Sequence, residues 1–161
     1  MRNYTGPEVR EDEMPQKEQD QCALALQQPG EIEFTGNTGS LVFLGGFSGS
    51  IGIWRNTKTG ASGDYHTIGG GVGLGVGFTQ DYGKARSLAA FVGYGETLDV
   101  GGSIGPVGGS YSATQNAAGD WVSSGGALGY SPSILSSRRL GATATATAGE
   151  TFIRNCHVRG Q

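Results

Sequence analysis

The chain has 161 residues, a length that suits one domain with a single core. Of its 31 glycines, 29 lie after residue 30, where their share is several times the usual ~7%. The net charge of −3 comes from residues 1–30, since residues 31–161 carry eight acidic and eight basic side chains. Neither segment is basic enough to form a nucleic-acid-binding face.

Residues 1–29 are predicted to form a flexible polar arm ahead of a glycine-rich β-barrel domain at residues 30–161. Within the arm, residues 22–28 (CALALQQ) suit a short helix or an extended lead-in that stops at Pro29-Gly30. No apolar run approaches the ~18 residues of a membrane-spanning helix, and the charged N-terminus lacks the apolar region of a secretory signal. We therefore expect a chain that is cytoplasmic before export and is then secreted, or delivered to a target cell, without a classical signal peptide. A mature or excised piece is the other option.

From residue 31 onward, apolar residues alternate with small ones. In residues 41–54 the odd positions form one apolar face, and Asn56–Gly60 is predicted to be a hairpin turn. The clearest run is 66–78, in which glycine occupies the odd positions from Gly69 to Gly77. Only a two-residue period places the bulky side chains on one face and the glycines on the other, which predicts a strand. The candidate membrane or core face of this strand consists of Ile68, Val72, Leu74, Val76 and Phe78.

The remaining elements follow in chain order. A turn is expected at Gln80–Lys84, then a strand over 86–100 with Leu88, Ala90, Val92 and Tyr94 on one face. The later segments are a strand bent at Pro106, a turn at Asn116–Asp120, a strand at Trp121–Tyr130, a loop at 131–139 and a last strand at Leu140–Ile153. The pattern predicts an all-β fold: an antiparallel meander of about seven or eight strands, closed into a barrel or packed as a sandwich.

Three arrangements of such a sheet remain open. In a soluble barrel or sandwich, the bulky face of residues 66–78 would form the core. In a membrane barrel the same face would meet lipid while glycine and threonine line the interior. In a self-associating sheet, glycine faces would stack on each other. The charge-free run 66–80 favours the membrane arrangement, whereas Arg86 and Glu96 leave too few uncharged residues between them to span a bilayer.

No residue set indicates a reaction or a cofactor. The Gly69–Gly77 run lacks both G-x-G-x-x-G and G-K-[ST], so no nucleotide site is expected. His66 at a strand entrance suits a surface or capping role, and His157 has no metal-ligand spacing to the cysteines. We therefore predict a non-enzymatic protein with no catalytic residue, no cofactor and no metal ligand. Arg138-Arg139 is expected in a solvated loop.

The two cysteines, Cys22 and Cys156, lie near opposite ends of the chain. If closure of a barrel makes the first and last strands neighbours, the two residues form a disulfide across a very long loop. Otherwise they are two unrelated thiols, and the spacing alone leaves both options open.

The stretch Phe47–Phe78 (FSGSIGIWRNTKTGASGDYHTIGGGVGLGVGF), with the later segments VGGSIGPVGGSYS and SSGGALGYSP, is similar to a known group of domains. It resembles the glycine-rich β-domains near the C-termini of bacterial polymorphic toxins, including RHS-type proteins. The resemblance covers roughly residues 40–153 and rests on texture rather than on an invariant motif. Such domains are delivered into neighbouring cells, and some act on membranes. The resemblance implies no catalytic residue.

These observations lead to two functional hypotheses of different classes. The first is a non-enzymatic bacterial effector or toxin-like domain that acts on or inserts into membrane lipid and forms a pore after homo-oligomerisation. The alternative is a soluble β-barrel that binds an apolar small molecule or serves as a protein-interaction or structural module. Nucleic acid is not an expected partner of either.

Overall fold

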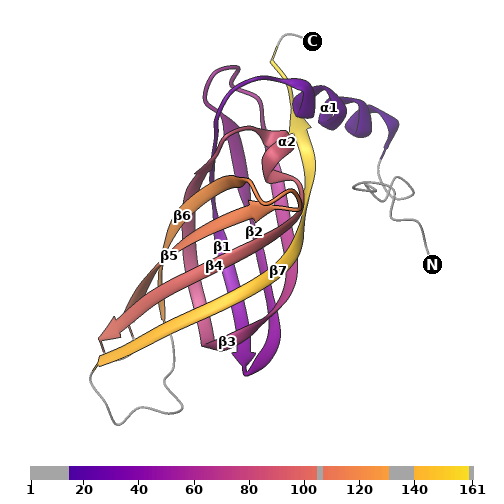
Figure 1. Cartoon of the computed structure of the whole chain (residues 1–161). Coiled ribbons are helices and arrows are strands. Elements are labelled where there is room, and N and C mark those ends of the chain that lie inside the picture. Colours follow the sequence, from indigo (N-terminus) through magenta and orange to yellow (C-terminus); the bar gives the residue numbers. More distant parts are fainter. Residues whose placement is uncertain (1–14, 105–106, 131–139, 160–161) are drawn as a thin grey trace, which may run out of the picture.

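The computed structural model describes residues 15–104, 107–130 and 140–159. They form a tilted β-barrel with two helices at one end (Figure 1). The elements are α1 (Gln16–Gln27), β1 (Ile32–Phe43), β2 (Gly45–Asn56), β3 (Ser62–Ala85), α2 (Leu88–Phe91), β4 (Gly93–Ile104), β5 (Val107–Asn116), β6 (Trp121–Tyr130) and β7 (Leu140–His157). The all-β barrel predicted from the alternation is confirmed, but the strand order is not that of the predicted meander, because β3 pairs with β6 and β4 pairs with β7.

The strands close into a ring because the two halves of β3 occupy different places in it. The first half of β3, residues 62–73, pairs with β2 and β7. The second half, residues 74–85, pairs with β1, and residues 78–85 of it also pair with β6. Around the barrel, the order is therefore β1, β2, first half of β3, β7, β4, β5, β6 and second half of β3. Every pairing is antiparallel, so seven strands supply eight members of a closed barrel.

Strand β3 reverses direction around the tip of the β1–β2 hairpin. Its halves run in opposite directions because each is antiparallel to a different strand of that hairpin. At the tip, the backbone N–H of Leu44 donates to the carbonyl of Gly73, 2.9 Å away. Gly73 has a φ of +144°, and a Cβ there would lie 2.5 Å from the carbonyl oxygen of Ala144. Glycine is therefore required at this bend, and the run 66–78 contains two strand segments instead of one.

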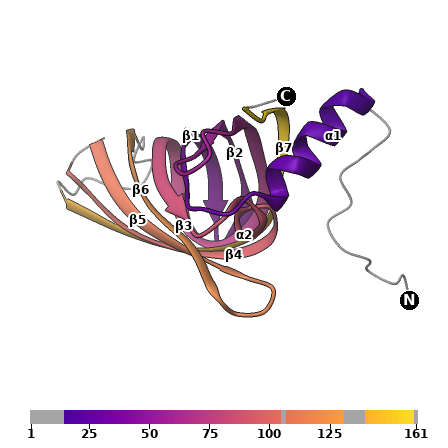
Figure 2. The ribbon, with the colours of Figure 1, turned by 90° about the horizontal axis from the view of Figure 1, so that it is seen from above.

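The register fixes the shape of the barrel. A path along paired residues leaves β7 at Arg154, passes through β3, β2, β1, β3, β6, β5 and β4, and returns to β7 at Ala144. The path thus ends ten residues from its start. With eight members, a rise of ~3.3 Å per residue and a spacing of ~4.8 Å, a stagger of this size tilts the strands by about 40°. Figure 2 shows the same strands curving around the barrel when it is seen from above.

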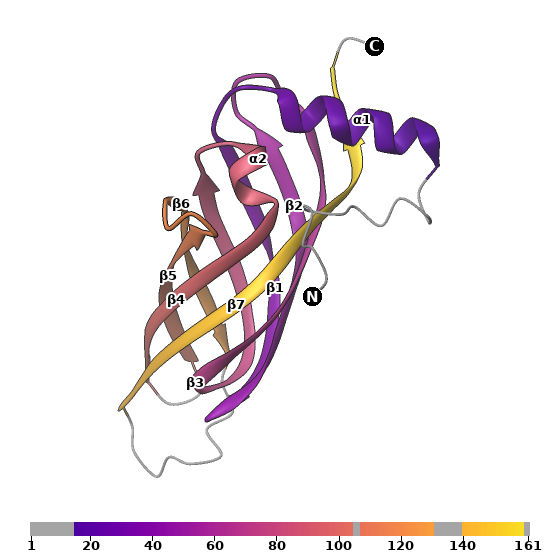
Figure 3. The same ribbon diagram turned by 45° about the vertical axis from the view of Figure 1, so that its right-hand side comes forward.

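A small apolar core lies where the helices cover the end of the barrel. We call this the helix end, and the opposite end, with the β1–β2 turn, the hairpin end. Helix α1 lies beside the C-terminal part of β7 (Figure 3). The buried residues here are Cys22, Ala25, Ile32, Trp54, Ala61, Tyr65, Ala85, Leu88, Ile153 and Cys156.

Several local predictions differ from the structure. A short helix was one of two options for residues 22–28, but residues 16–21, expected to be flexible, are helical as well, because Cys22 and Ala25 bury α1 against the barrel. The expected turn at Gln80–Lys84 lies inside β3. The expected strand over 86–100 begins only at Gly93, since Leu88–Phe91 is helical; the Ser87 hydroxyl caps that helix by accepting from the Ala90 N–H at 3.1 Å. The expected strand bent at Pro106 is two strands, because the residues before it end β4 and those after it begin β5, which pairs antiparallel with β4. Pro106 itself and the loop 131–139, including Arg138-Arg139, lie outside the described residues.

Candidate functional site

The outer face of the barrel is apolar. Ile68, Val72 and Phe78, three members of the candidate face, point outward with exposed fractions of 64%, 60% and 75%. The side chains of Leu74 and Val76 lie outside the described part of the structure. The bulky face of β3 is therefore not a core face, so the soluble arrangement in which these residues pack inside is wrong for the three that are described. Other large apolar side chains exposed on this surface include Leu41, Phe47, Ile51, Ile53, Leu98, Val100, Ile104, Val107, Tyr111 and Leu128.

This outer apolar surface, which we call the belt, has a similar height on five of the strands. Ten-residue segments free of Asp, Glu, Lys and Arg occur in five strands: 34–43, 45–54, 107–116, 121–130 and 140–149. Ten residues at ~3.3 Å each, tilted by about 40°, span about 25 Å along the barrel axis. Arg86 and Glu96 were expected to bound a strand too short to span a bilayer. They do not lie in one strand, because α2 separates them.

Uncharged polar residues also face outward, at the edge of the belt nearer the helices. Asn37 lies beside Gln80 on one side, and Ile51 separates it from His66 on the other. The ring of His66 stacks on Phe152, with centroids 5.0 Å apart. Desolvation, and then the nearby Arg154, lower the pKa of His66, which favours its neutral form. His66 therefore adds no charge to the outer face at neutral pH, whereas Glu150 of β7, opposite Ile68, places a carboxylate at this edge of the belt.

The inner face of the barrel is polar and built from small side chains. Threonine, serine and glycine dominate the lining of a cavity of ≈ 290 Å³ in the barrel, which we call the lumen. Its hydroxyl-bearing residues are Thr38, Ser40, Ser48, Ser50, Thr67, Thr79, Thr97, Ser110, Ser112, Thr114, Ser123, Ser124, Thr145, Thr147 and Thr151. An eight-stranded barrel is narrow enough for ordinary side chains to fill it, so the small lining residues account for the remaining space.

Two carboxylates face this lumen. Asp81 of β3 accepts hydrogen bonds from the hydroxyls of Thr38 and Thr79, the latter at 2.7 Å. Asp99 of β4 has Ser110 as its hydrogen-bond partner. Burial raises the pKa of both carboxyls above the ordinary value, and the charge on Asp81 raises that of Asp99 further. The two groups therefore share one electrostatic environment although they lie on different strands.

Three aromatic rings lie together at the helix end of the lumen. Phe34 of β1 stacks on Phe91 of α2 with centroids 4.9 Å apart, and Tyr65 of β3 meets the edge of this pair at 6.0 and 5.1 Å. We call these residues the aromatic cluster. Gly52 provides room for it, since a Cβ at that position would lie 2.7 Å from Cε1 of Tyr65. Burial, and then the charge of Asp81, raise the pKa of Tyr65, so its hydroxyl stays protonated.

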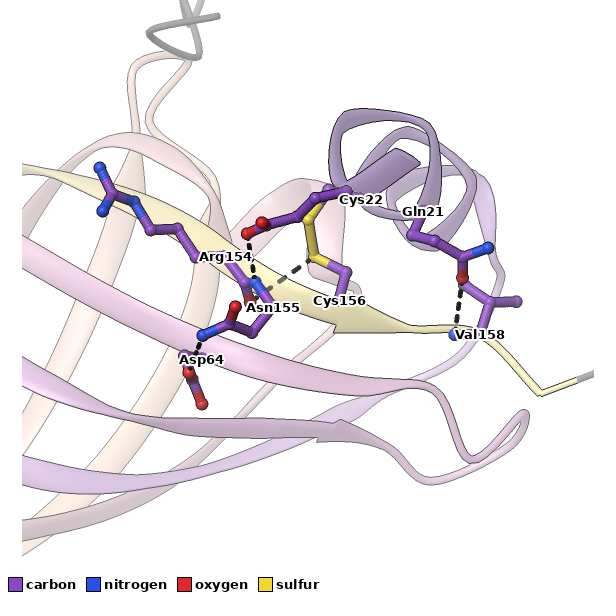
Figure 4. Close-up of a disulfide and its surroundings, with 8 residues drawn as sticks. Gln21, Cys22, Asp64, Arg154, Asn155, Cys156 and Val158 are labelled. Atoms are coloured by element: carbon purple, nitrogen blue, oxygen red, sulfur yellow. Dashed lines mark hydrogen bonds between the residues drawn. A yellow bond between two sulfur atoms is a disulfide. The ribbon is translucent and has the colours of Figure 1, made fainter. Parts of the chain in front are cut away.

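The helix end carries a covalent tie between the ends of the chain. Cys22 of α1 and Cys156 of β7 form a disulfide with their Cα atoms 5.0 Å apart (Figure 4). Beside it, the Asn155 backbone N–H donates to Glu18 at 2.9 Å, and the Asn155 side-chain amide donates to Asp64 at 2.6 Å. The Val158 N–H donates to the side-chain oxygen of Gln21 at 3.2 Å. Together these contacts hold α1 against the last strand.

Charged side chains gather on the outside near the helix end. Lys84 lies 3.1 Å from Glu31 and 3.4 Å from Glu33, in exposed ion pairs that add little stability. Tyr82 lies on the outer face of β3 between Lys84 and the belt, whereas Tyr94 and Trp121 lie farther toward the helix end than the nearby charges of Glu96 and Lys84. The hydroxyl of Tyr94 donates to Glu96 at 3.4 Å. Along β3, the apolar Phe78, the aromatic Tyr82 and the charged Lys84 thus follow one another toward the helix end.

The described residues provide neither a candidate metal site nor a membrane-spanning helix. There, no group of three or more His, Cys, Asp or Glu side chains is arranged to hold a metal ion. Within the same part of the chain, no helix is long and apolar enough to cross a membrane. Sequence reasoning did not single out Asp81, Asp99 or the aromatic cluster. The outward-inward alternation could have assigned Asp81 to the glycine face of β3, had residues 80–84 been recognised as strand.

Comparison with known proteins gives no further constraint. The chain matches no family model, no curated protein and no solved structure. The similarity to polymorphic toxin domains therefore stays a prediction from the sequence.

Proposed function

We propose that this chain is a membrane-inserted β-barrel whose belt lies in the hydrocarbon layer of a lipid bilayer. The observation that carries the proposal is the inverted polarity of the barrel. Large apolar side chains face outward, while hydroxyls, glycines and two carboxylates face inward. In water this arrangement would expose an apolar surface far larger than soluble monomers tolerate. In a bilayer the outer apolar side chains contact lipid, while the inner polar side chains are shielded from it.

The dimensions support the same assignment. A belt about 25 Å tall matches the apolar band of membrane β-barrels, and ten-residue strands reach the ~9–11 residues that a tilted strand needs to cross a bilayer. Tyr82 lies where an interfacial aromatic residue would be, between the belt and the charged Lys84. Closure of the ring pairs each of the described strands on both sides, which leaves none of them an open edge to face lipid.

The effector or toxin part of the proposal rests on the resemblance to delivered bacterial domains. A domain with its own lipid-facing belt needs no catalytic residue to act on a membrane. One chain closes the barrel, so oligomerisation would serve pore formation between barrels and not barrel closure. Export of the full chain to the periplasm of a test bacterium should lower its membrane potential. Unchanged potential and growth at confirmed export would remove this part of the proposal.

The soluble alternative with an apolar ligand would need an apolar interior. The lumen lining includes apolar side chains such as Phe34 and Phe91, but it also holds the carboxyls of Asp81 and Asp99, so we do not propose an apolar ligand.

Flotation with liposomes tests membrane insertion. The purified chain should float with vesicles and resist carbonate extraction. Val100→Arg places a charge in the belt and should reduce insertion by about 2–4 kcal/mol. Glu96→Arg, on the same face of β4 but at the charged rim, is the matched control and should insert like the native chain. A native chain that stays in the aqueous fraction with every lipid composition would rule out insertion.

A further inference from the structure

We propose that the lumen is a binding site for a small organic ammonium ion. The inference goes beyond membrane insertion and does not depend on it, because the lumen lies inside the barrel whatever surrounds the belt.

The first observation is space with a polar lining. A cavity of ≈ 290 Å³ remains where an eight-stranded barrel is ordinarily filled by its own side chains. The cavity is kept open by Gly69 and Gly77 of β3 and by Gly95 of β4, all of which line it. A volume of this size accommodates a compact organic ion and its remaining water.

The second observation is the sign of the charge. Asp81 and Asp99 are the only acidic side chains among the described lining residues, and no Lys, Arg or His lines the cavity with them. Burial disfavours ionisation of both carboxyls, and the charge on Asp81 further disfavours ionisation of Asp99. A cation between them compensates both charges at once, whereas an anion meets only repulsion.

The third observation is the aromatic cluster, which favours an organic cation over a simple metal ion as the ligand. Phe34, Tyr65 and Phe91 line the same cavity, and the charge of Asp81 reaches Tyr65. Aromatic rings close to carboxylates attract alkylammonium groups through cation–π contact and cover their methyl groups. Hard metal ions instead prefer several oxygen ligands. The described residues provide no group of three or more Asp, Glu, His or Cys side chains arranged to hold a metal ion.

Protons compete for this site. The titratable side chains that face the lumen in the described structure are Tyr65, Asp81 and Asp99. Burial raises the pKa of both aspartates, so acidification neutralises them before ordinary carboxyls are fully protonated. Binding of the cation should weaken as the pH falls.

The test compares choline with 3,3-dimethylbutan-1-ol, which has the same shape without the charge. Binding to the folded full-length chain in detergent micelles is followed by calorimetry and by NMR shifts of the lumen threonines. Choline should bind at least about tenfold more tightly than its neutral analogue. Equal affinity for the two compounds, or binding of neither, would overturn the proposal.

Variants assign the effect to the lumen. Asp99→Asn should weaken choline binding about tenfold or more, and Asp81→Asn should do the same if the barrel tolerates the altered bonds to Thr38 and Thr79. Glu96→Gln removes a carboxylate from the outside of β4 and should leave binding unchanged. Choline affinity that drops in Glu96→Gln but not in Asp99→Asn would contradict a lumen site. Because the assay needs only a folded barrel, its failure is distinct from a failure to insert into vesicles.

Discussion

Cys22 and Cys156 are 134 residues apart in the sequence, yet a disulfide joins them at the helix end of the barrel. The bond ties α1 to the last strand and closes almost the whole chain into one covalent loop. A loop of that length removes much conformational freedom from the unfolded chain, which in the chain-entropy picture stabilises the fold by about 4–5 kcal/mol.

We expect the double variant Cys22→Ser/Cys156→Ser to lose about 3–5 kcal/mol of unfolding free energy, as measured by urea denaturation in detergent. Reduction of the native protein with a dithiol should lower its stability similarly. Addition of the same dithiol to the double variant is the control and should have no effect. An unchanged midpoint in the variant would show that the hydrogen bonds of α1 to β7 suffice.

The bend in β3 gives a second prediction. Gly73→Ala adds a Cβ that would lie 2.5 Å from a backbone oxygen, at a φ of +144°. We expect a loss of about 2 kcal/mol or more, or failure of the barrel to close. Gly49→Ala is the matched control, because the nearest atom to its Cβ is 3.6 Å away, and it should stay within about 1 kcal/mol of the native protein. Equal effects of the two substitutions would refute the requirement for glycine at the bend.

The lumen carboxylates predict an unusual dependence of stability on pH. Asp81 and Asp99 have folded-state pKa values above the ordinary value, so the folded barrel binds more protons than the unfolded chain as their range is crossed. Stability must therefore rise as the pH falls toward the ordinary carboxyl pKa, and this gain is lost as the pH rises through the folded values.

The comparison that isolates this effect is the change in unfolding midpoint between pH 7 and pH 4.5. The native chain should gain stability on acidification relative to Asp99→Asn, which lacks one of the two groups. Glu96→Gln, at the rim, should follow the native chain. A steeper gain in Asp99→Asn than in the native protein would have the wrong sign for a buried carboxylate.

The aromatic cluster gives a fourth prediction. Phe91→Ala removes the ring that stacks on Phe34 and touches Tyr65, and it should cost about 3–5 kcal/mol of stability if the site does not collapse. Phe91→Leu, which keeps most of the apolar volume, should cost less but should weaken choline binding as the alanine variant does. Choline affinity unaffected by Phe91→Leu would remove Phe91 from the proposed site.

The alternation in the sequence predicted strands, their approximate number and the sorting of residues onto two faces. It could not assign Val72 and Phe78 to the inside or the outside, because a two-residue period is the same for a soluble and an inverted barrel. The short helix at Leu88–Phe91 was missed since a brief apolar run suits strand and helix equally. Likewise, the partner of Cys22 depended on ring closure, which is a property of all the strands together.

The most direct test of the central claim measures contact of the belt with lipid chains. In a Trp121→Phe background the only tryptophan is Trp54, which faces inward and is 1% exposed. Its fluorescence should resist quenching by lipids brominated near the bilayer centre, whereas a new tryptophan from Val100→Trp should be strongly quenched. If aqueous quenchers reduce the fluorescence of the Val100→Trp variant and brominated lipids do not, the result would contradict the membrane barrel.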